Sequence, residues 1–257
     1  MKIVIIGGTG MIGSKLTAKL HSLGFDAIAA APETGVNTVT GEGLATALER
    51  AQVVVDVSNN PSFEVGVAQN FFETSGRNLQ AAESVAGVRH HILLTIVGTE
   101  RMPDNIYYRA KVAQENIVKS GSIPFTILHA TQFFEFASSF LYTSNKDQSI
   151  PLPPALMQPI AADDVVATLA DLAVSEPLNA AIEVAGPEKI PMDEFVRLYL
   201  NAIGDSHQVI TDESAGFFGT IVNDSSLTPG DNPRIGHILY EDWLRTTTQS
   251  QQSSAIH

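Results

Sequence analysis

A short glycine-rich segment near the amino terminus constrains the fold more than any other feature of this chain. Residues 3–6 form a continuous apolar run rich in β-branched side chains, which is typical of a strand buried on both faces. Gly7, Gly10 and Gly13 follow at intervals of three residues, and residues 14–23 carry leucines at helical spacing before Gly24. A strand, a glycine turn and a helix in this order provide the context that a dinucleotide-binding fingerprint requires.

Each glycine of this turn has a chemical reason. Gly7 permits a tight turn out of the strand, Gly10 lets backbone amides approach a pyrophosphate, and Gly13 lets the helix pack closely on the sheet. The first amides of the helix and its partial positive charge favour phosphate. The alternative is a glycine-rich turn without a ligand, and the position, flanks and spacing argue against it. The predicted cofactor-binding residues here are Gly7, Thr9, Gly10, Met11, Ile12 and Gly13.

The rest of the chain repeats the same alternation. We expect strands at 25–31, 53–57, 88–97 and 124–129, and helices at 41–50, 64–86 and 106–120. This pattern predicts an α/β fold, a Rossmann-type doubly wound parallel sheet with a small carboxy-terminal substrate-binding region. The expected divisions are a NAD(P)-binding core at 1–132, a mixed region at 133–245 whose residues 159–186 complete the core, and a poorly ordered polar tail at 246–257. Residues 144–159 are expected to form a loop, and 191–203 an amphipathic helix.

Composition excludes several classes of function. The formal net charge of −13 repels a nucleic acid backbone, so we expect no direct nucleic acid binding. The chain has no cysteine, and His90 and His91 lack a third ligand at metal spacing, so we expect no metal site. No signal peptide or membrane-length apolar run is present, which makes a cytoplasmic protein the expectation.

The end of the second strand bears on the choice of cofactor. An acidic residue there holds the ribose 2′-hydroxyl of NAD, and an arginine holds the 2′-phosphate of NADP. Ala30, Ala31 and Pro32 offer neither, and Glu33 comes slightly late, which favours NADP(H) weakly over NAD(H).

Ser58 and Asn59 follow the third strand, at 53–57, and ligands of such sheets lie beyond the carboxyl ends of the strands. They are therefore predicted to contact the cofactor, at its adenosine or ribose. A polar turn before Pro61 is an equally open interpretation.

A second informative motif is Tyr107-Tyr-Arg-Ala-Lys111. Tyr107 and Lys111 are four residues apart and share a face of the expected helix, whereas Tyr108 has no lysine at that spacing. An ammonium lowers the pKa of a neighbouring phenol from about 10, and it can also bond the nicotinamide ribose. The Thr95 hydroxyl, at the end of the preceding strand, can bond a substrate carbonyl while Tyr107 passes the proton. We therefore predict Tyr107, Lys111 and Thr95 as catalytic, with Thr95 and Lys111 also contacting the cofactor. The alternatives are a surface lysine and a tyrosine packed under a loop.

Six motifs together resemble the atypical short-chain dehydrogenase/reductases of the NmrA-like NAD(P)-binding group. They are the turn at 7–13, Thr95-Ile-Val-Gly-Thr, the motif at 107–111, Ala130-Thr-Gln-Phe-Phe, Ile160-Ala-Ala-Asp-Asp-Val and Val184-Ala-Gly-Pro. The resemblance implies a Rossmann domain with a substrate lid in the carboxy-terminal region, and a motif lysine that is often kept when the tyrosine is not. The group also includes redox sensors that bind NAD(P) without turnover. The chain departs from the NADP-type pattern at Ala31, where a basic residue is common.

Three functions remain open from the sequence. The favoured one is an NAD(P)H-dependent oxidoreductase that reduces a small, apolar carbonyl or quinone, with Phe133 and Phe136 lining the substrate pocket as the resemblance implies. The alternative is a non-catalytic NAD(P)-binding redox sensor that acts through a protein partner. A nucleotide-sugar epimerase would use the same tyrosine and lysine but needs a larger polar pocket. Apolar residues such as these two phenylalanines also occur in plain core packing, and the oligomeric state is not predicted.

Overall fold

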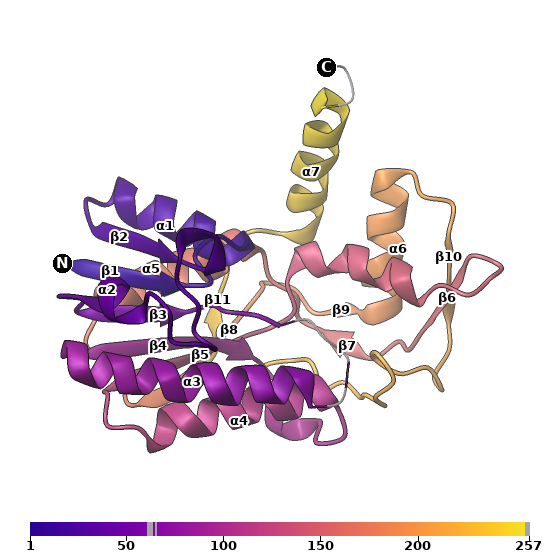
Figure 1. Ribbon diagram of the computed structural model, residues 1–257. Coiled ribbons are helices and arrows are strands. Elements are labelled where there is room, and N and C mark those ends of the chain that lie inside the picture. Colours follow the sequence, from indigo (N-terminus) through magenta and orange to yellow (C-terminus); the bar gives the residue numbers. More distant parts are fainter. Residues whose placement is uncertain (61–63, 65, 255–257) are drawn as a thin grey trace. The chain divides into compact units, whose positions relative to one another are not determined.

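The computed structural model describes residues 1–60, 64 and 66–254. Its largest element is a seven-stranded sheet with the order β11-β8-β5-β4-β3-β1-β2 (Figure 1). The strands are β1 (Lys2–Ile6), β2 (Asp26–Ala30), β3 (Val53–Asp56), β4 (His90–Ile96), β5 (Phe125–Ala130), β8 (Ala180–Ala185) and β11 (Arg234–Ile235).

The sheet is parallel and its chain order reverses at β1. In the register, Ile3 of β1 faces Ala27 of β2 on one side and Val53 of β3 on the other. Strands β3 and β4 pair in parallel, as do β8 and β11. The predicted doubly wound parallel sheet is therefore confirmed. Such a reversal places a ligand crevice at the carboxyl ends of the strands beside β1.

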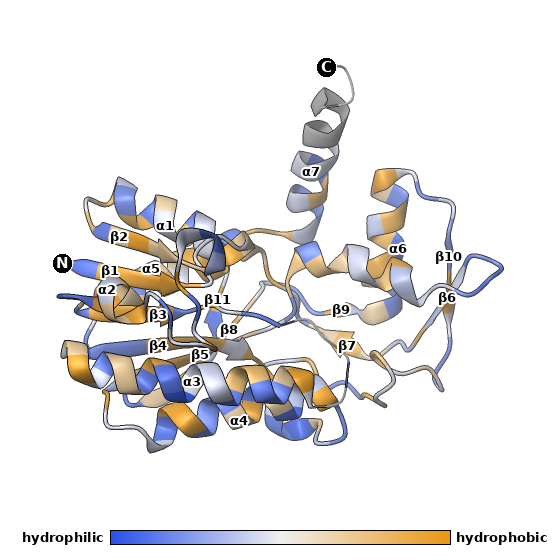
Figure 2. Ribbon diagram, in the orientation of Figure 1, coloured by the Kyte–Doolittle hydropathy of each residue, from blue (hydrophilic) through white to orange (hydrophobic). Residues whose placement is uncertain are grey.

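Helices cover both faces of the sheet. Helix α1 (Met11–Ser22) lies on one face, whereas α3 (Val67–Ala86) and α4 (Ile106–Ser120) lie together on the other (Figure 1). Orange and blue segments alternate along α3 and α4, as expected for helices with one packed and one exposed face (Figure 2). Among the described residues, no helix has both the length and the apolarity needed to cross a lipid bilayer.

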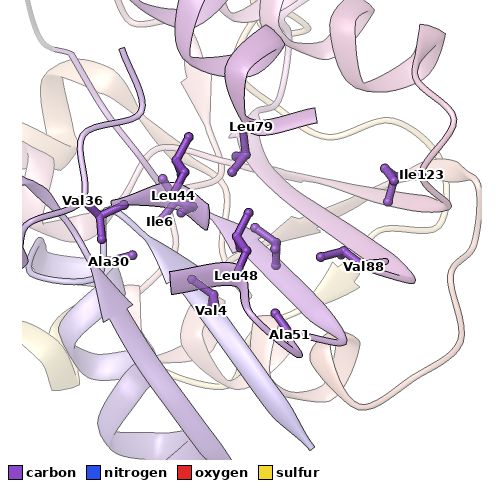
Figure 3. Close-up of a cluster of buried hydrophobic side chains, with 11 residues drawn as sticks. Val4, Ile6, Ala30, Val36, Leu44, Leu48, Ala51, Leu79, Val88 and Ile123 are labelled. Atoms are coloured by element: carbon purple, nitrogen blue, oxygen red, sulfur yellow. The ribbon is translucent and has the colours of Figure 1, made fainter. Parts of the chain in front are cut away.

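The apolar core beneath α3 joins the first strands to the short helix α2 (Leu44–Leu48) (Figure 3). Leu44 and Leu48 from α2 and Leu79 from α3 meet the strand residues Val4 and Val54. These side chains are almost fully buried. The core therefore fixes β1 and β3, whose carboxyl ends carry the glycine turn and the Ser58–Asn59 segment.

The chain divides into two compact units. The first comprises 1–129 and 165–182, and the second comprises 130–164 and the chain from 183 onward. The first unit holds most of α5 (Ala162–Ala173) and the short helices η1 (Pro32–Thr34) and η2 (Thr99–Arg101). It also holds every predicted cofactor-binding and catalytic residue.

The second unit differs from the sequence expectation in two places. The expected loop at 144–159 contains β6 (Ser149–Leu152) and β7 (Leu156–Met157). Strand β6 pairs with β10 (Gln208–Thr211), and β7 pairs with β9 (Ile190–Pro191). Strands of two to four residues carry too few positions for a period of two to be read from sequence.

The polar segment from Thr246 is helical rather than irregular, because α7 (Tyr240–Ser254) runs through it. Residues 255–257 of the expected tail lie outside the described part of the chain. The remaining helices of this unit are η3 (Phe134–Thr143) and α6 (Met192–Ile203). The limits of α6 agree with the expected helix at 191–203.

Candidate cofactor and catalytic site

The glycine turn between β1 and α1 is closely packed. Gly7 has a left-handed backbone with φ of +77°, which side chains other than glycine rarely adopt. A Cβ on Gly13 would lie 2.2 Å from the Gly7 carbonyl oxygen, and a Cβ on Gly8 would lie 2.5 Å from the Ala29 Cα. Gly10 is more open, because its Cβ would meet only the Gly7 carbonyl oxygen, at 3.3 Å. Close packing therefore accounts for Gly7, Gly8 and Gly13, but it does not account for Gly10.

Hydrogen bonds fasten this turn to the second strand. The amides of Gly7 and Gly8 both donate to the Ala30 carbonyl oxygen, at 2.9 and 3.2 Å, and the Gly10 amide donates to the Gly7 carbonyl at 3.0 Å. Gly10 is the N-cap of α1 and supplies no side-chain cap. The amides of Met11, Ile12 and Gly13 form the first helical turn, where backbone donors lack helical partners. These amides and the helix dipole suit an anion.

An acidic side chain reaches the turn from the end of β2. The Thr9 hydroxyl donates to Glu33 Oε2 at 3.1 Å, and Glu33 itself is exposed. The short helix η1 brings Glu33 back toward the turn, with the Thr34 hydroxyl accepting from the Ala31 amide. A carboxylate therefore stands beside Thr9, although Glu33 comes three residues after the last strand residue, Ala30.

The end of β3 adjoins the glycine turn. A Cβ on Gly7 would meet the Ser58 Cα at 2.9 Å, so the two backbones are in contact. The Ser58 amide donates to Asp56 Oδ1 at 2.9 Å, which shapes the bend after the strand. Within the described residues, the buried Ser58 hydroxyl has no hydrogen-bond partner. A buried polar atom without a partner is costly, so this hydroxyl could bond a ligand.

Tyr107 lies in the first turn of α4. The Asn105 side chain caps this helix by accepting from the amides of Tyr107 and Tyr108, both at 3.1 Å. The Tyr107 hydroxyl donates to Asn59 Oδ1, which joins α4 to the segment after β3. Burial raises the pKa of Tyr107 to about 12. The expectation that Lys111 lowers the pKa of this tyrosine is wrong in this structure, because burial raises that pKa and the Lys111 ammonium bonds Gln114 and the Leu94 carbonyl instead.

Lys111 faces the protein interior and is 3% exposed. Its ammonium donates to Gln114 Oε1 at 2.6 Å and to the Leu94 carbonyl at 3.2 Å, and it lies 4.5 Å from the centre of the Phe72 ring. Burial lowers the pKa of Lys111 to about 8, although the charges of Asp56 and Glu115 partly offset this effect. Tyr107 and Lys111 thus share a helix, but within the described part of the chain their polar atoms have separate partners.

Thr95 joins a different cluster. Its hydroxyl donates to Glu115 Oε1 at 3.0 Å, and both side chains are buried. His129 also bonds Glu115 Oε1, at 3.1 Å, and Lys119 bonds Glu115 Oε2 at 3.0 Å. Burial would raise the pKa of Glu115, but the hydrogen bonds and charges of His129 and Lys119 lower it to about 2. The three predicted catalytic side chains are therefore not gathered around one point in this state.

The predicted substrate-binding phenylalanines lie in the second unit, and both are half-buried. Phe133 forms an isolated parallel bridge with Ile160. The Phe136 ring packs against Phe140, Phe217 and Phe218, at centroid distances of 5.6, 6.1 and 5.4 Å. Phe136 therefore belongs to a cluster of four aromatic rings, and Phe133 does not share these ring contacts.

Sequence reasoning missed four residues near this site. Asp56, Gln114, Glu115 and Gly8 make the contacts given above, but none was predicted to have a role. Asp56 carried a weak signal, since it is the one charged residue in the apolar run 53–57. In the described part of the chain, no group of three or more His, Asp or Glu side chains is placed to hold a metal ion.

Comparisons with known proteins identify the fold. No protein-family model and no curated protein matches the sequence. Among solved structures, dTDP-4-dehydrorhamnose reductase from Bacillus anthracis, in complex with NADP, has a TM-score of 0.76 at 14% identity, covering 97% of this chain and 99% of that chain. UDP-glucose 4-epimerase from Thermotoga maritima has a TM-score of 0.73 at 14% identity, covering 99% and 100%.

A short-chain dehydrogenase/reductase superfamily protein from Agrobacterium tumefaciens, with bound NAD, has a TM-score of 0.71 at 14% identity, covering 99% of this chain and 98% of that chain. At this level of identity the similarity establishes a shared architecture over nearly the whole chain.

Proposed function

We propose that this chain is an NAD(P)-dependent oxidoreductase of the short-chain dehydrogenase type, related to the NmrA-like group, that reduces a small carbonyl or quinone compound. The glycine turn carries this proposal. It offers the amides of Met11, Ile12 and Gly13, which no side chain caps, and its Gly7 backbone contacts Ser58, whose hydroxyl has no partner among the described residues. Solved structures of the same architecture bind NADP or NAD, which supports the assignment.

The residues present fit a nicotinamide dinucleotide. The amides at 11–13 would hold the pyrophosphate, with Gly7, Gly10 and Gly13 keeping the backbone free of Cβ atoms. Thr9, Ser58 and Asn59 would bond the sugar hydroxyls. When bound, the nicotinamide supplies hydride chemistry. In this proposal Tyr107 delivers a proton to the substrate oxygen, while Lys111 and Thr95 orient the ribose and the substrate.

Glu33 favours NAD(H) over NADP(H), against the weak preference expected from the sequence. Its carboxylate bonds Thr9 of the glycine turn, near the place where this fold receives the adenosine ribose. A carboxylate there accepts a hydrogen bond from a ribose 2′-hydroxyl and repels a 2′-phosphate. The direct test is calorimetric titration with NAD, NADH, NADP and NADPH. We expect binding of the NAD pair to be tighter, and failure of all four to bind would overturn the proposed function.

For turnover, the Tyr107 hydroxyl must leave the hydrogen bond to Asn59 that this structure shows. This hydroxyl is protonated at neutral pH and donates to Asn59, so it holds a proton to give. Proton transfer is most efficient when the donor pKa lies near the working pH. We therefore expect ligand binding to move the Tyr107 hydroxyl from Asn59 to the substrate.

The assay for turnover is oxidation of NADH or NADPH with a panel of small aldehydes, ketones and quinones. The matched variants are Tyr107→Phe, which removes one hydroxyl, and Lys111→Ala. We expect Tyr107→Phe to reduce turnover about 100-fold or more while nucleotide affinity is retained. Full activity in both variants would show that the assigned roles are wrong.

The substrate part of the proposal depends on the aromatic cluster of Phe136, Phe140, Phe217 and Phe218. Phe136 and Phe218 are half-buried, whereas Phe140 and Phe217 are buried, so the first two are the rings that a ligand could reach, and aromatic rings favour an apolar or aromatic ligand. We expect Phe136→Ala to raise KM for quinones more than KM for short aliphatic aldehydes. An equal effect on both would indicate that Phe136 serves packing alone.

A non-catalytic redox sensor is the second candidate, and one observation favours it. The buried Lys111 ammonium is held by Gln114, the Leu94 carbonyl and the Phe72 ring, and so it is engaged without a ligand. A sensor would bind nucleotide without turnover over the whole substrate panel. Its partner protein would bind with different affinity to the NAD-loaded and the NADH-loaded chain.

The charge of the second unit argues against a nucleotide-sugar epimerase. That unit contains fifteen Asp and Glu residues and five Lys and Arg residues. Two of the five are engaged by acids, since Arg197 contacts Asp193 and Glu194, and Arg245 contacts Asp242. A nucleoside diphosphate is best held by arginine or lysine. We expect titration with UDP-glucose to give no binding.

A further inference from the structure

A buried chain of hydrogen bonds joins the end of β3 to Lys111. Asp56 Oδ2 accepts from Gln114 Nε2 at 2.9 Å, and Gln114 Oε1 accepts from the Lys111 ammonium at 2.6 Å. The exposed fractions of Asp56, Gln114 and Lys111 are 3%, 1% and 3%. The carboxylate and the ammonium are therefore linked through a single amide, out of contact with water.

The two ends of this chain fix the direction of the amide. A carboxylate only accepts hydrogen bonds and an ammonium only donates them, so Gln114 must turn its NH₂ toward Asp56 and its oxygen toward Lys111. In this direction the amide dipole stabilises both charges. A side chain of the same length without the amide would remove one hydrogen bond from each buried charge, which is costly.

Asp56 is the natural counter-charge for Lys111. The other carboxylate whose charge acts on Lys111 is Glu115 of α4, and Glu115 already bonds Lys119 and His129. Among the described residues, the side chain of Asp56 accepts hydrogen bonds from Gln114 and from the Ser58 amide, and its charge also acts on the buried His91, which is itself paired with Glu83. The other described contacts of the ammonium are neutral, since α3 contributes the Phe72 ring, β4 contributes the Leu94 carbonyl, and Tyr107 precedes it by one helical turn.

We propose that Asp56, acting through Gln114, is the positioning residue that holds Lys111 in place as a charged ammonium beside the cofactor site. This inference builds on the proposed function, in which Lys111 serves the dinucleotide. It assigns roles to Asp56 and Gln114, whose buried side chains act through Lys111 and the Ser58 amide. Because Asp56 also bonds the Ser58 amide, the same carboxylate shapes the segment that carries the Ser58 hydroxyl.

The test is an NMR titration of the full chain labelled with ¹³C at the lysine Cε positions, in the absence of nucleotide. The Lys111 signal is assigned by its loss in Lys111→Arg. We expect its midpoint near pH 8, where burial places the pKa, while solvated lysines titrate near the ordinary value of about 10.4. A Lys111 midpoint well below pH 7 would overturn the proposal, even if no variant folded, because the side chain would then be neutral at working pH and no counter-charge would be holding an ammonium.

The variants separate charge from packing. Asp56→Asn and Gln114→Met are expected to lower the Lys111 midpoint by about one unit or more, because the ammonium loses its counter-charge or its acceptor. Thr126→Val is the matched control, since it removes a buried hydroxyl that bonds His90 and leaves this chain intact. Its midpoint should equal that of the wild type.

Outcomes for this inference and for the proposed function are distinguishable. Unchanged Lys111 midpoints in folded Asp56→Asn and Gln114→Met would refute the role of Asp56, whatever the chain binds. Shifted midpoints in a chain that binds no nicotinamide nucleotide would support the buried linkage and refute the proposed function. In a chain that turns over, Asp56→Asn should displace the pH profile of kcat, whereas Thr126→Val should leave it in place.

Discussion

Two glycines of the turn before α1 provide a sharp test of how that turn works. In Gly13→Ala, the new Cβ would lie 2.2 Å from the Gly7 carbonyl oxygen and 2.6 Å from the Gly8 Cα. Both neighbours are backbone, so the helix and the turn must separate by about 1 Å to restore a contact of ordinary length. In Gly10→Ala the nearest atom would be 3.3 Å away, and the Gly10 φ of −73° suits alanine.

The expected magnitudes differ for the two substitutions. Overpacking costs about 1–3 kcal/mol, and replacing glycine by alanine within a helix returns about 1 kcal/mol, so the net loss of unfolding free energy lies between about 0 and 2 kcal/mol. Because the new Cβ meets two backbone atoms, we expect Gly13→Ala near the upper value, which for a chain of this size lowers Tm by about 4–8 °C. Gly10→Ala, at the N-cap, should cost less than about 1 kcal/mol.

Thermal unfolding followed by circular dichroism measures Tm, and calorimetry with NADH measures affinity. We expect Gly13→Ala to lose both stability and affinity. We expect Gly10→Ala to keep its Tm but to bind NADH at least about ten-fold more weakly, since the Cβ stands where phosphate oxygens approach. If Gly13→Ala has the Tm and affinity of the wild type, the packing argument is wrong. If Gly10→Ala binds normally, the phosphates do not approach Gly10.

Three further predictions concern charge. Glu33→Arg should reverse the preference between NADH and NADPH by about ten-fold or more, because a cation replaces the carboxylate beside Thr9, and competitive titration measures the ratio. Burial lowers the pKa of His91, but the charge and hydrogen bond of Glu83, at 2.7 Å, raise it overall. The ion pair therefore stabilises the fold fully below the ordinary pKa of 6.5, and this contribution to the unfolding free energy is lost as pH rises through the raised pKa. Glu83→Gln should therefore cost about 3–5 kcal/mol in urea unfolding at pH 6, and a smaller loss at pH 6 than at pH 9 would refute the assignment. The pKa of Glu115 lies near 2, so its ionised carboxylate stabilises the fold fully above the ordinary pKa of 4.5, and this contribution declines as pH falls toward 2. Glu115→Gln should therefore have a lower unfolding free energy at neutral pH, and that free energy should change less between pH 4.5 and pH 2 than in the wild type, as measured by acid unfolding.

Local signals explain why much of the first unit could be predicted from the sequence. Helix α4 has the predicted limits of 106 and 120 because Asn105 caps its first turn and Gly121 follows its last residue. The turn at 7–13 could be located because a buried strand ends there and a helix begins, and the tight connection between them requires glycine. In both cases the residues that decide the structure are neighbours in the chain.

The partners of the predicted catalytic residues could not be predicted, because distant residues set them. The spacing of Tyr107 and Lys111 places them on one helical face, but it says nothing about where their polar atoms bond. Lys111 turns toward Gln114, whose amide is in turn fixed by Asp56, 58 residues earlier in the chain. Thr95 turns toward Glu115, twenty residues later. Side-chain direction here depends on tertiary burial, which has no local sequence signal.

The carbonyl oxygen of Ala30 receives two amides from the turn, those of Gly7 and Gly8. If this turn binds the phosphates as proposed, it already has its shape before any nucleotide binds, because the neighbouring strand holds it. Little chain freedom is left to be lost on complex formation, so association should be fast and limited by encounter. Substitutions that disrupt the edge strand β2 should then lower the association rate constant of the nucleotide, even when every glycine of the turn is retained.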